Sequence, residues 1–306
     1  MHTRRSFLKT GAALTAGISL GGLNRLFAVP QTSPTPSQSV LAAVRDGSRA
    51  DMCDQALRML GGIEVLVKKG QRVLVKPNIG WDVPPERGAN THPELVVRVI
   101  ELCRAAGASS VTVFDNSCDQ WQRAYATSGA EGACRGTGAT LVNGKDLGLY
   151  RQVEIPNGVK LKSAKVHSLY LDSDVVINVP VLKHHSGTLM TACMKNLMGV
   201  VWDRGFYHSN DLHQCIADLL TLRKPDLNIL DAYHPMVRNG PRGRSADDVV
   251  VMKTLLASPD IVAIDAAAAK LLEHQPSDVR HIALASGMGL GVMELERVDI
   301  RRFKMT

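Results

Sequence analysis

The chain has 306 residues, of which 45% are hydrophobic and 21% are charged. This composition is typical of a globular protein large enough for one extensive core or two smaller ones. It excludes a disordered chain, a collagen-like repeat and a disulfide-stapled miniprotein. No run of about 18 or more apolar residues occurs, which excludes an integral membrane protein.

The net charge of +7 is concentrated near the N-terminus. Residues 1–28 carry +4, from Arg4, Arg5, Lys9 and Arg25 with no acid, which leaves +3 for the remainder. Aromatic residues make up only 4% of the chain. Nucleic-acid-binding proteins usually combine a clustered basic face with stacking aromatic side chains. We therefore expect no nucleic-acid partner.

The leading segment is typical of a twin-arginine export signal. Residues 3–9, Thr-Arg-Arg-Ser-Phe-Leu-Lys, match the export consensus, and a weakly apolar stretch follows over residues 10–23. That stretch is too short for a stable membrane span. We expect residues 1–28 to be a signal peptide read by the twin-arginine translocase, with no stable membrane span after processing and a periplasmic or other extracytoplasmic location. The alternative is a basic tail ahead of an ordinary helix.

Residues 29–39 are rich in Pro, Ser and Thr and predict a flexible linker, so the folded domain is expected over residues 40–306. Twin-arginine substrates cross the membrane folded, commonly with a cofactor or metal already loaded. This favours a bound group without identifying it. The six cysteines show no CxxC or ferredoxin-type spacing, so we expect mostly free thiols and no iron–sulfur cluster.

Apolar runs and helical periodicity alternate along the rest of the chain. They predict, in chain order, a strand at 73–75, a helix capped by Thr91 and ending near Gly107, strands at 111–114, 139–142 and 174–179, a helix at 210–222, strands at 227–230 and 249–256, and a helix at 259–273. The alternation predicts an α/β fold with three layers, in which a mostly parallel sheet carries helices on both faces. A subdomain between about 117 and 172 is an open alternative.

Polar side chains follow the predicted strands where ligands of open α/β sheets bind, outside the carboxyl ends. They are Lys76, Asn78, Asp115, Asn116, Lys183, His184, His185 and Asp231. Lys195 and Asn196 interrupt a later apolar run, and a lysine there needs a partner or a ligand. Lysines, amides and a helix N-terminus suit an anion such as a carboxylate or a phosphate. The alternative for each residue is an ordinary turn.

Two further groups leave their roles open. His185, His208 and Asp231 are candidate ligands of a divalent metal, although no known metal-site spacing supports them. Arg238, Arg242 and Arg244 lie on a glycine-rich loop that either clamps an anion, with Arg242 as the substrate-binding candidate, or is a solvated surface loop.

Several of these motifs together resemble the DUF362 family. They are Lys76-Pro77-Asn78, the segment 178–185 ending in Lys183-His184-His185, the segment 191–199 containing Lys195-Asn196-Leu197-Met198-Gly199, Asp231 before Gly240-Pro241, and Ala263-Ile264-Asp265. The resemblance spans roughly residues 70–290. It implies a shared site of Lys76, Asn78, Lys183, His184, Lys195 and Asn196. Many members carry iron–sulfur motifs, which this chain lacks, and the resemblance implies no substrate.

Three functions remain open at this point. The leading hypothesis is an exported enzyme that acts on a small anionic substrate, bound by Lys76, Lys183 and Lys195, with His184 or Asp115 transferring a proton. The second is a non-catalytic periplasmic protein that binds a metal or a metabolite. The third is a redox partner related to the iron–sulfur members of the family.

Overall fold

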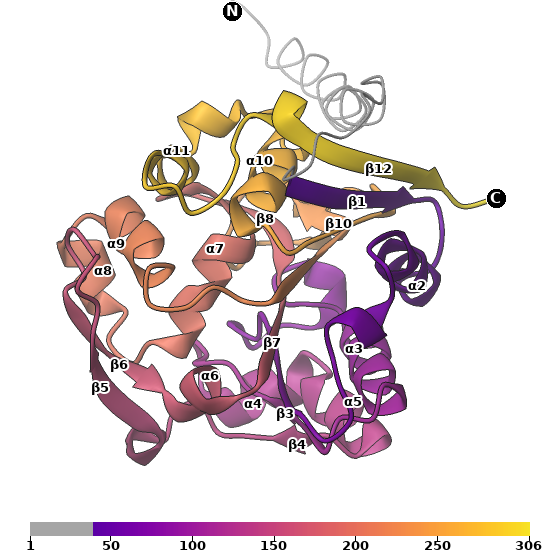
Figure 1. The fold of residues 1–306 in the computed structure, drawn as a ribbon, viewed down its shortest axis with the longest axis horizontal. Helices are drawn as coiled ribbons and strands as arrows, with labels where there is room; N and C mark the ends of the chain where they lie inside the picture. Colours follow the sequence, from indigo (N-terminus) through magenta and orange to yellow (C-terminus); the bar gives the residue numbers. More distant parts are fainter. Residues whose placement is uncertain (1–38) are drawn as a thin grey trace, which may run out of the picture.

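A computed structural model describes residues 39–306 (Figure 1). The expected signal peptide over residues 1–28, and the expected linker up to residue 38, lie outside the described residues. The last linker residue, Ser39, instead begins the first strand of the sheet, because residues 39–45 pair on both edges with strands from the far end of the chain.

The fold is built on a ten-stranded mixed sheet and a separate two-stranded one. The path through the main sheet is β12-β1-β11-β10-β7-β2-β3-β4, with β8 and β9 attached beside β10. The strands are β1 (Ser39–Arg45), β2 (Arg72–Pro77), β3 (Ser110–Val113), β4 (Thr140–Leu141), β5 (Tyr150–Glu154), β6 (Ser163–His167), β7 (Val175–Val179), β8 (Val181–His185), β9 (Leu189–Thr191), β10 (Leu227–Met236), β11 (Thr254–Ser258) and β12 (Val298–Lys304). Most pairings in the main sheet are parallel, as expected.

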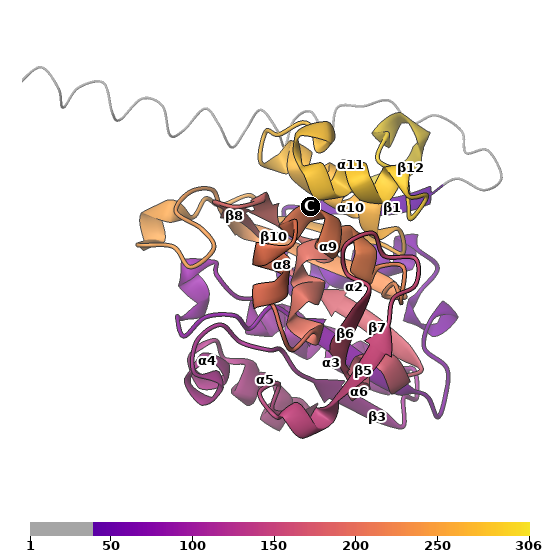
Figure 2. The ribbon, with the colours of Figure 1, turned by 90° about the vertical axis from the view of Figure 1, so that its left-hand side faces the viewer.

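Helices cover both faces of the sheet, which confirms the predicted three-layer α/β fold (Figures 1 and 2). They are α2 (Arg49–Met59), α3 (Pro93–Ala105), α4 (Trp121–Thr127), α5 (Ala130–Thr137), α6 (Ser168–Asp172), α7 (Cys193–Asn196), α8 (Gly205–Ser209), α9 (Leu212–Leu219), α10 (Ile261–Leu271) and α11 (Arg280–Gly287). Alternation along β1 feeds two cores: Leu41 and Ala43 pack on one face, and Ala42 and Val44 on the other.

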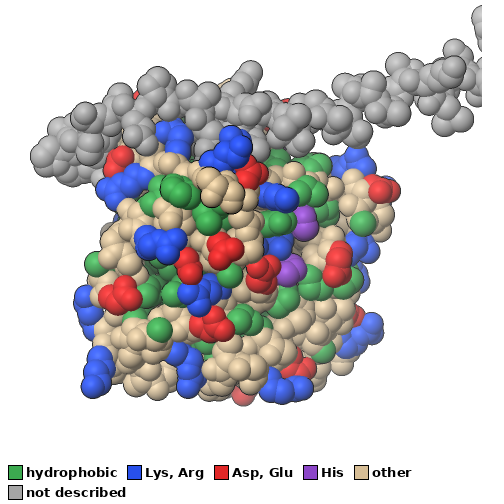
Figure 3. All heavy atoms as spheres, turned by 90° about the vertical axis from the view of Figure 1, so that its right-hand side faces the viewer, with side chains coloured by type: hydrophobic (Ala, Val, Ile, Leu, Met, Phe, Trp, Pro, Cys, Tyr) green, Lys and Arg blue, Asp and Glu red, His purple; other side chains and the backbone are tan. Residues whose placement is uncertain are grey.

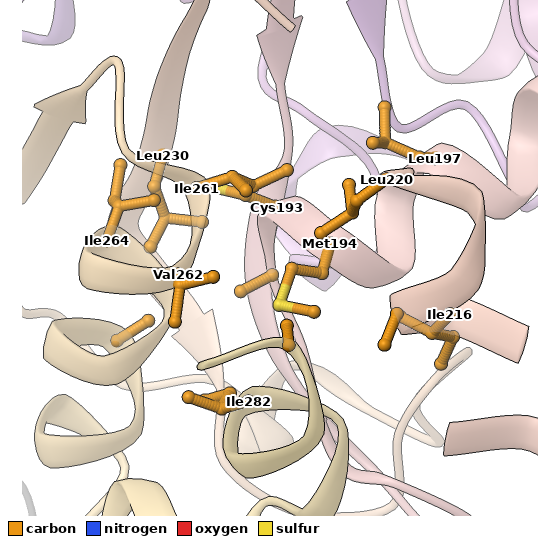
Figure 4. Packing of buried hydrophobic residues seen from close by; sticks show 14 of the residues in the cluster. Cys193, Met194, Leu197, Ile216, Leu220, Leu230, Ile261, Val262, Ile264 and Ile282 are labelled. Carbon is orange, nitrogen blue, oxygen red and sulfur yellow. The ribbon is translucent and has the colours of Figure 1, made fainter. Parts of the chain in front are cut away.

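The core on the α10 face is packed around the short helix α7. Cys193 and Met194 of α7 lie among apolar side chains of α9, α10 and α11, including Ile216, Val262 and Ile282 (Figure 4). All of these side chains are almost completely buried. Such packing holds α7 rigidly, and α7 carries Lys195 and Asn196 at its end.

Most predicted elements are present, with shifted boundaries. Helix α3 begins after His92 rather than Thr91, because the His92 ring accepts the Glu94 N–H while the Thr91 hydroxyl donates to Val179 O. Strand β10 runs on to Met236, and β11 starts at Thr254 rather than 249. Residues 117–172 do not form a separate subdomain, because β4 joins the main sheet and β5 and β6 form a hairpin.

The described surface mixes both signs of charge. On the face shown in Figure 3, Lys and Arg side chains are interspersed with Asp and Glu side chains. Among residues 39–306, no helix combines the length and the apolar character needed to cross a membrane.

Candidate functional site

Four of the predicted strand-end residues, Asn78, Asp115, Lys183 and His185, line a cavity of about 410 Å³. We call it the strand-end cavity. Its lining comes from the loops after β2 and β3, from β8 and β9, and from the segment 195–208. The side chains used below are Asn78, Asp115, Cys118, Lys183, His185, Thr191, Lys195, Asn196, Arg204 and His208. It therefore lies at the carboxyl ends of β2, β3 and β8, where open α/β sheets bind their ligands.

Lys76 lies behind the wall of this cavity and is paired with Asp115. Lys76 is fully buried, its Nζ is 2.9 Å from Asp115 Oδ1, and it donates to the Pro77 carbonyl. Burial lowers the pKa of Lys76, and Asp115 opposes that shift. Gly199 closes over the pair, since a Cβ there would be 1.9 Å from Asp115 Oδ1 and 2.9 Å from Lys76 Nζ. The pair is thus part of the scaffold that supports the cavity.

A network of asparagine amides forms the floor of the cavity. Asn78 donates to Asn196 Oδ1, and Asn196 donates both to Asn178 Oδ1 and to the Lys76 carbonyl. Asn178 in turn donates to Asn228. Both amide protons of Asn196 are therefore bound within the protein, so Asn196 orients its neighbours. Asn78 has one amide N–H without a hydrogen-bond partner among residues 39–306.

Lys183 and Lys195 have only neutral partners. Lys183 donates to Asn78 Oδ1 and to the Ala89 carbonyl, and Lys195 lies 3.3 Å from the Met198 sulfur. Burial is the main reason why the pKa of Lys183 falls to about 7 and that of Lys195 to about 8. Within residues 39–306, neither ammonium group has a carboxylate partner.

Two residues of the cavity lining, Cys118 and Arg204, were not predicted from the sequence. Arg204 donates to the Ser117 carbonyl and to the sulfur of Cys118, at 2.9 and 3.3 Å. Cys118 follows β3 closely, in the same strand-end position as Asp115 and Asn116, and that position was the available signal. Arg204 carries no comparable signal, because it reaches the cavity from the loop before α8.

His184 does not join the other predicted residues. Side chains alternate along a strand, so Lys183 and His185 face the strand-end cavity while His184 lines a second cavity of about 560 Å³. There His184 Nδ1 accepts the Gly240 N–H. His184 and Asp115, the two alternative candidates for proton transfer, therefore line different cavities.

The three candidate metal ligands do not meet. His185 and His208 both line the strand-end cavity, where burial and the nearby Lys195 lower their pKa values, that of His185 to about 2. Asp231 lies elsewhere, buried against Arg49 at 3.0 Å. Among the described residues, no group of three or more His, Cys, Asp or Glu side chains is arranged to hold a metal.

Arg242 also lies outside the lining of the strand-end cavity. Its guanidinium is 3.4 Å from Asp119 and sits over the Trp81 ring. In the same loop, Arg238 and the Arg244 N–H are both bound to Asp248. The loop reaches the cavity only through Pro241.

Residues 73–270 match DUF362, a domain whose function is undefined, and this range contains every lining residue of the strand-end cavity. The chain belongs to the DUF362 family. Residues 1–21 match the signal sequence of the twin-arginine translocation pathway, so this DUF362 protein carries an export signal.

The chain is also similar to one curated protein and to one solved structure. The thylakoid-associated protein sll1697 of Synechocystis is 29% identical in an alignment of 253 residues that covers 76% of this chain and 73% of that protein. The lactate racemase apoprotein of Thermoanaerobacterium thermosaccharolyticum aligns with a TM-score of 0.44 and 11% identity. That alignment covers 82% of this chain and 57% of the racemase chain.

Some residues of the DUF362 motifs line the cavity, and others, such as Asp265, hold the elements that carry the lining residues. Asp265 is fully buried on α10 and accepts the N–H groups of Cys193 and Met194, at 2.7 and 3.0 Å. These are the first residues of α7, whose last turn presents Lys195 to the cavity. Burial raises the pKa of Asp265 to about 7. Asp265 is thus a positioning residue, which fixes α7 and has no contact with the cavity.

Proposed function

We propose that this protein acts, after export to the periplasm or an equivalent compartment, on a small anionic molecule bound in the strand-end cavity. The observation that carries the proposal is the presence of three cations, Lys183, Lys195 and Arg204, around one cavity with only neutral or thiol partners. Uncompensated buried ammonium groups are costly, and an anion carrying carboxylate or phosphate groups would offset that cost.

The residue roles differ from the expectation based on sequence. Lys195 and Arg204 are the anion-binding groups, and Asn78 offers its free amide N–H to the same ligand. Lys183, with a pKa near 7, is suited to exchange a proton at neutral pH. It takes the role expected of His184, which lines the second cavity. Asp115 forms the buried ion pair with Lys76, so its role is to support the cavity wall.

Non-catalytic binding of a metabolite is the second candidate function. The same three cations support it, because they would hold an anion whether or not a reaction follows. A covalent reaction of the bound molecule in the cavity would distinguish catalysis from binding alone.

The first test is a thermal melt with sulfate and malonate as probes. A ligand at about 100 times its Kd stabilises a folded protein by about 2.7 kcal/mol, which corresponds to a rise in Tm of several degrees. We expect Lys195→Met to lose that rise and Lys69→Met to keep it, since Lys69 is exposed at the opposite end of β2. An equal rise in both variants would contradict the proposal.

Binding of the anion should also depend on pH. Lys183 and Lys195 attract an anion only when protonated, so affinity for sulfate, whose charge is constant, should fall as the pH rises from about 7 to 9. Loss of a proton-coupled contact weakens binding by up to about tenfold per pH unit. Titration calorimetry between pH 6 and 9.5 measures this fall. Lys195→Arg stays charged, so its affinity for sulfate should fall less at the upper end of this pH range. An affinity that does not change with pH in the unchanged protein would exclude both lysines as anion-binding groups.

A further inference from the structure

Cys118 is the exposed thiol of the strand-end cavity. Among the described cysteines, Cys53, Cys103, Cys134, Cys193 and Cys215 are buried, whereas Cys118 is exposed. Its backbone N–H donates to the Gly80 carbonyl at 2.8 Å, which fixes the loop after β3 against the loop after β2. The thiol therefore has a defined place at the rim of the cavity and access to solvent.

Cationic side chains surround the Cys118 sulfur. The Arg204 guanidinium is 3.3 Å from the sulfur, and Lys183 and Lys195 line the same cavity. Burial lowers the pKa of both lysines, and negative charge on Cys118 acts against that shift in each. Neighbouring cations are the environment in which a cysteine becomes a nucleophile.

A second feature of the cavity independently indicates a ligand. The Thr191 side chain is 3% exposed and lines the cavity, and its hydroxyl oxygen has no hydrogen-bond partner among the described residues. Buried hydroxyls are normally paired, because an unpaired one costs about 1–3 kcal/mol. A polar ligand atom in the cavity would provide the missing partner.

We propose that Cys118 is the nucleophile of the strand-end cavity and that its substrate is a small 2-oxo carboxylate. This inference rests on the proposed function, and it adds the reacting atom and the substrate class. Arg204 and Lys195 hold the carboxylate. The keto carbon beside it is then open to attack by the Cys118 sulfur, and Lys183 protonates the keto oxygen.

The covalent step is a reversible addition. The Cys118 sulfur forms a bond to the keto carbon, and the π pair of the carbonyl moves onto its oxygen. That oxygen takes a proton from the Lys183 ammonium group, which becomes a neutral amine. The product is a thiohemiketal, or a thiohemiacetal when the substrate is an aldehyde acid. No oxidant, reductant or leaving group is required. Cations that polarise the carbonyl and stabilise the alkoxide lower the barrier to this addition.

Alkylation of the folded full-length protein tests the nucleophile. Iodoacetate carries a carboxylate, and iodoacetamide is its neutral counterpart. We expect iodoacetate to modify Cys118 in preference to the five buried cysteines, and roughly tenfold faster than it modifies the denatured chain, because the cavity attracts anions. Peptide mass spectrometry locates the product. Relative to the denatured chain, Cys118 should gain more rate with iodoacetate than with iodoacetamide. Arg204→Met should lose this difference, and Lys69→Met should keep it.

Protection by small acids tests the addition. Glyoxylate should slow the reaction of Cys118 with iodoacetamide, whereas glycolate, of equal charge but without the carbonyl, should protect several-fold less. Equal protection by the two acids would overturn the substrate class. Reaction of Cys118 at the rate of the denatured chain would overturn the nucleophile. Neither result touches the sulfate-induced rise in Tm, which alone decides whether the cavity binds anions.

Discussion

Replacing Lys76 by Met should lower the free energy of unfolding by about 3–5 kcal/mol, because it leaves the Asp115 carboxylate buried without its cation. In a chain of this size, such a loss lowers Tm by on the order of 10 °C. The sequence alone indicates the opposite result for Lys76, since three converging lysines would repel one another and loss of one would relieve the strain. The ion pair with Asp115 reverses the sign for this lysine only.

Chemical denaturation of the unchanged protein, of Lys69→Met, Lys76→Met and Asp115→Asn, and of the double variant separates these outcomes. Lys69→Met removes an exposed ammonium group beyond the other end of β2 and should change stability little. The double variant Lys76→Met with Asp115→Asn should be less destabilised than the sum of its parts, because neither charge is then left alone. A Lys76→Met protein as stable as the control would show that the pair contributes nothing to the fold.

Gly199→Ala is expected to be nearly as damaging. The added methyl would lie 1.9 Å from Asp115 Oδ1, and Asp115 cannot move freely because it is held by Lys76 and by the Ile79 N–H. Overpacking costs about 1–3 kcal/mol, and separation of the ion pair adds to that. The same change should abolish the sulfate-induced rise in Tm, because Asp115 forms part of the cavity wall.

Gly132→Ala is the matched control for this variant. Gly132 is exposed within α5, and a Cβ there meets nothing within 4 Å. Alanine in an exposed helix interior stabilises by about 0.5–1 kcal/mol relative to glycine, so the two variants should move Tm in opposite directions. An unchanged Tm in Gly199→Ala would contradict the close packing of Gly199 against the Lys76–Asp115 ion pair.

The sequence predicted the fold class because periodicity and strand-to-helix alternation are local signals. The parallel strands β2, β3 and β7 each appear as short apolar runs, and polar residues follow them. Strands β1 and β12 escaped prediction. β12 lies at the edge of the sheet and β1 lies between β12 and β11, and their pairing joins residues that are distant in sequence. No local pattern reports such a pairing.

For the site, the sequence located the strand ends but not the direction of each side chain. Lys183 and His184 are adjacent, yet a strand sends them to different cavities. Asp231 was predicted at a strand end by the same argument, but its carboxylate forms an ion pair with Arg49 from α2. Arg204 reaches the cavity from a loop without strand periodicity. These outcomes depend on tertiary contacts, which composition and spacing do not encode.

The position of β1 has a consequence for the timing of export. β1 is the first described strand, and it lies between β11 and β12, whose residues 254–258 and 298–304 are made last. Strand pairing over such a separation waits for the whole intervening chain. The segment that follows the twin-arginine signal is therefore locked into the sheet only when synthesis has reached β12. A translocation route that carries folded proteins thus receives this domain after its first and last strands have met.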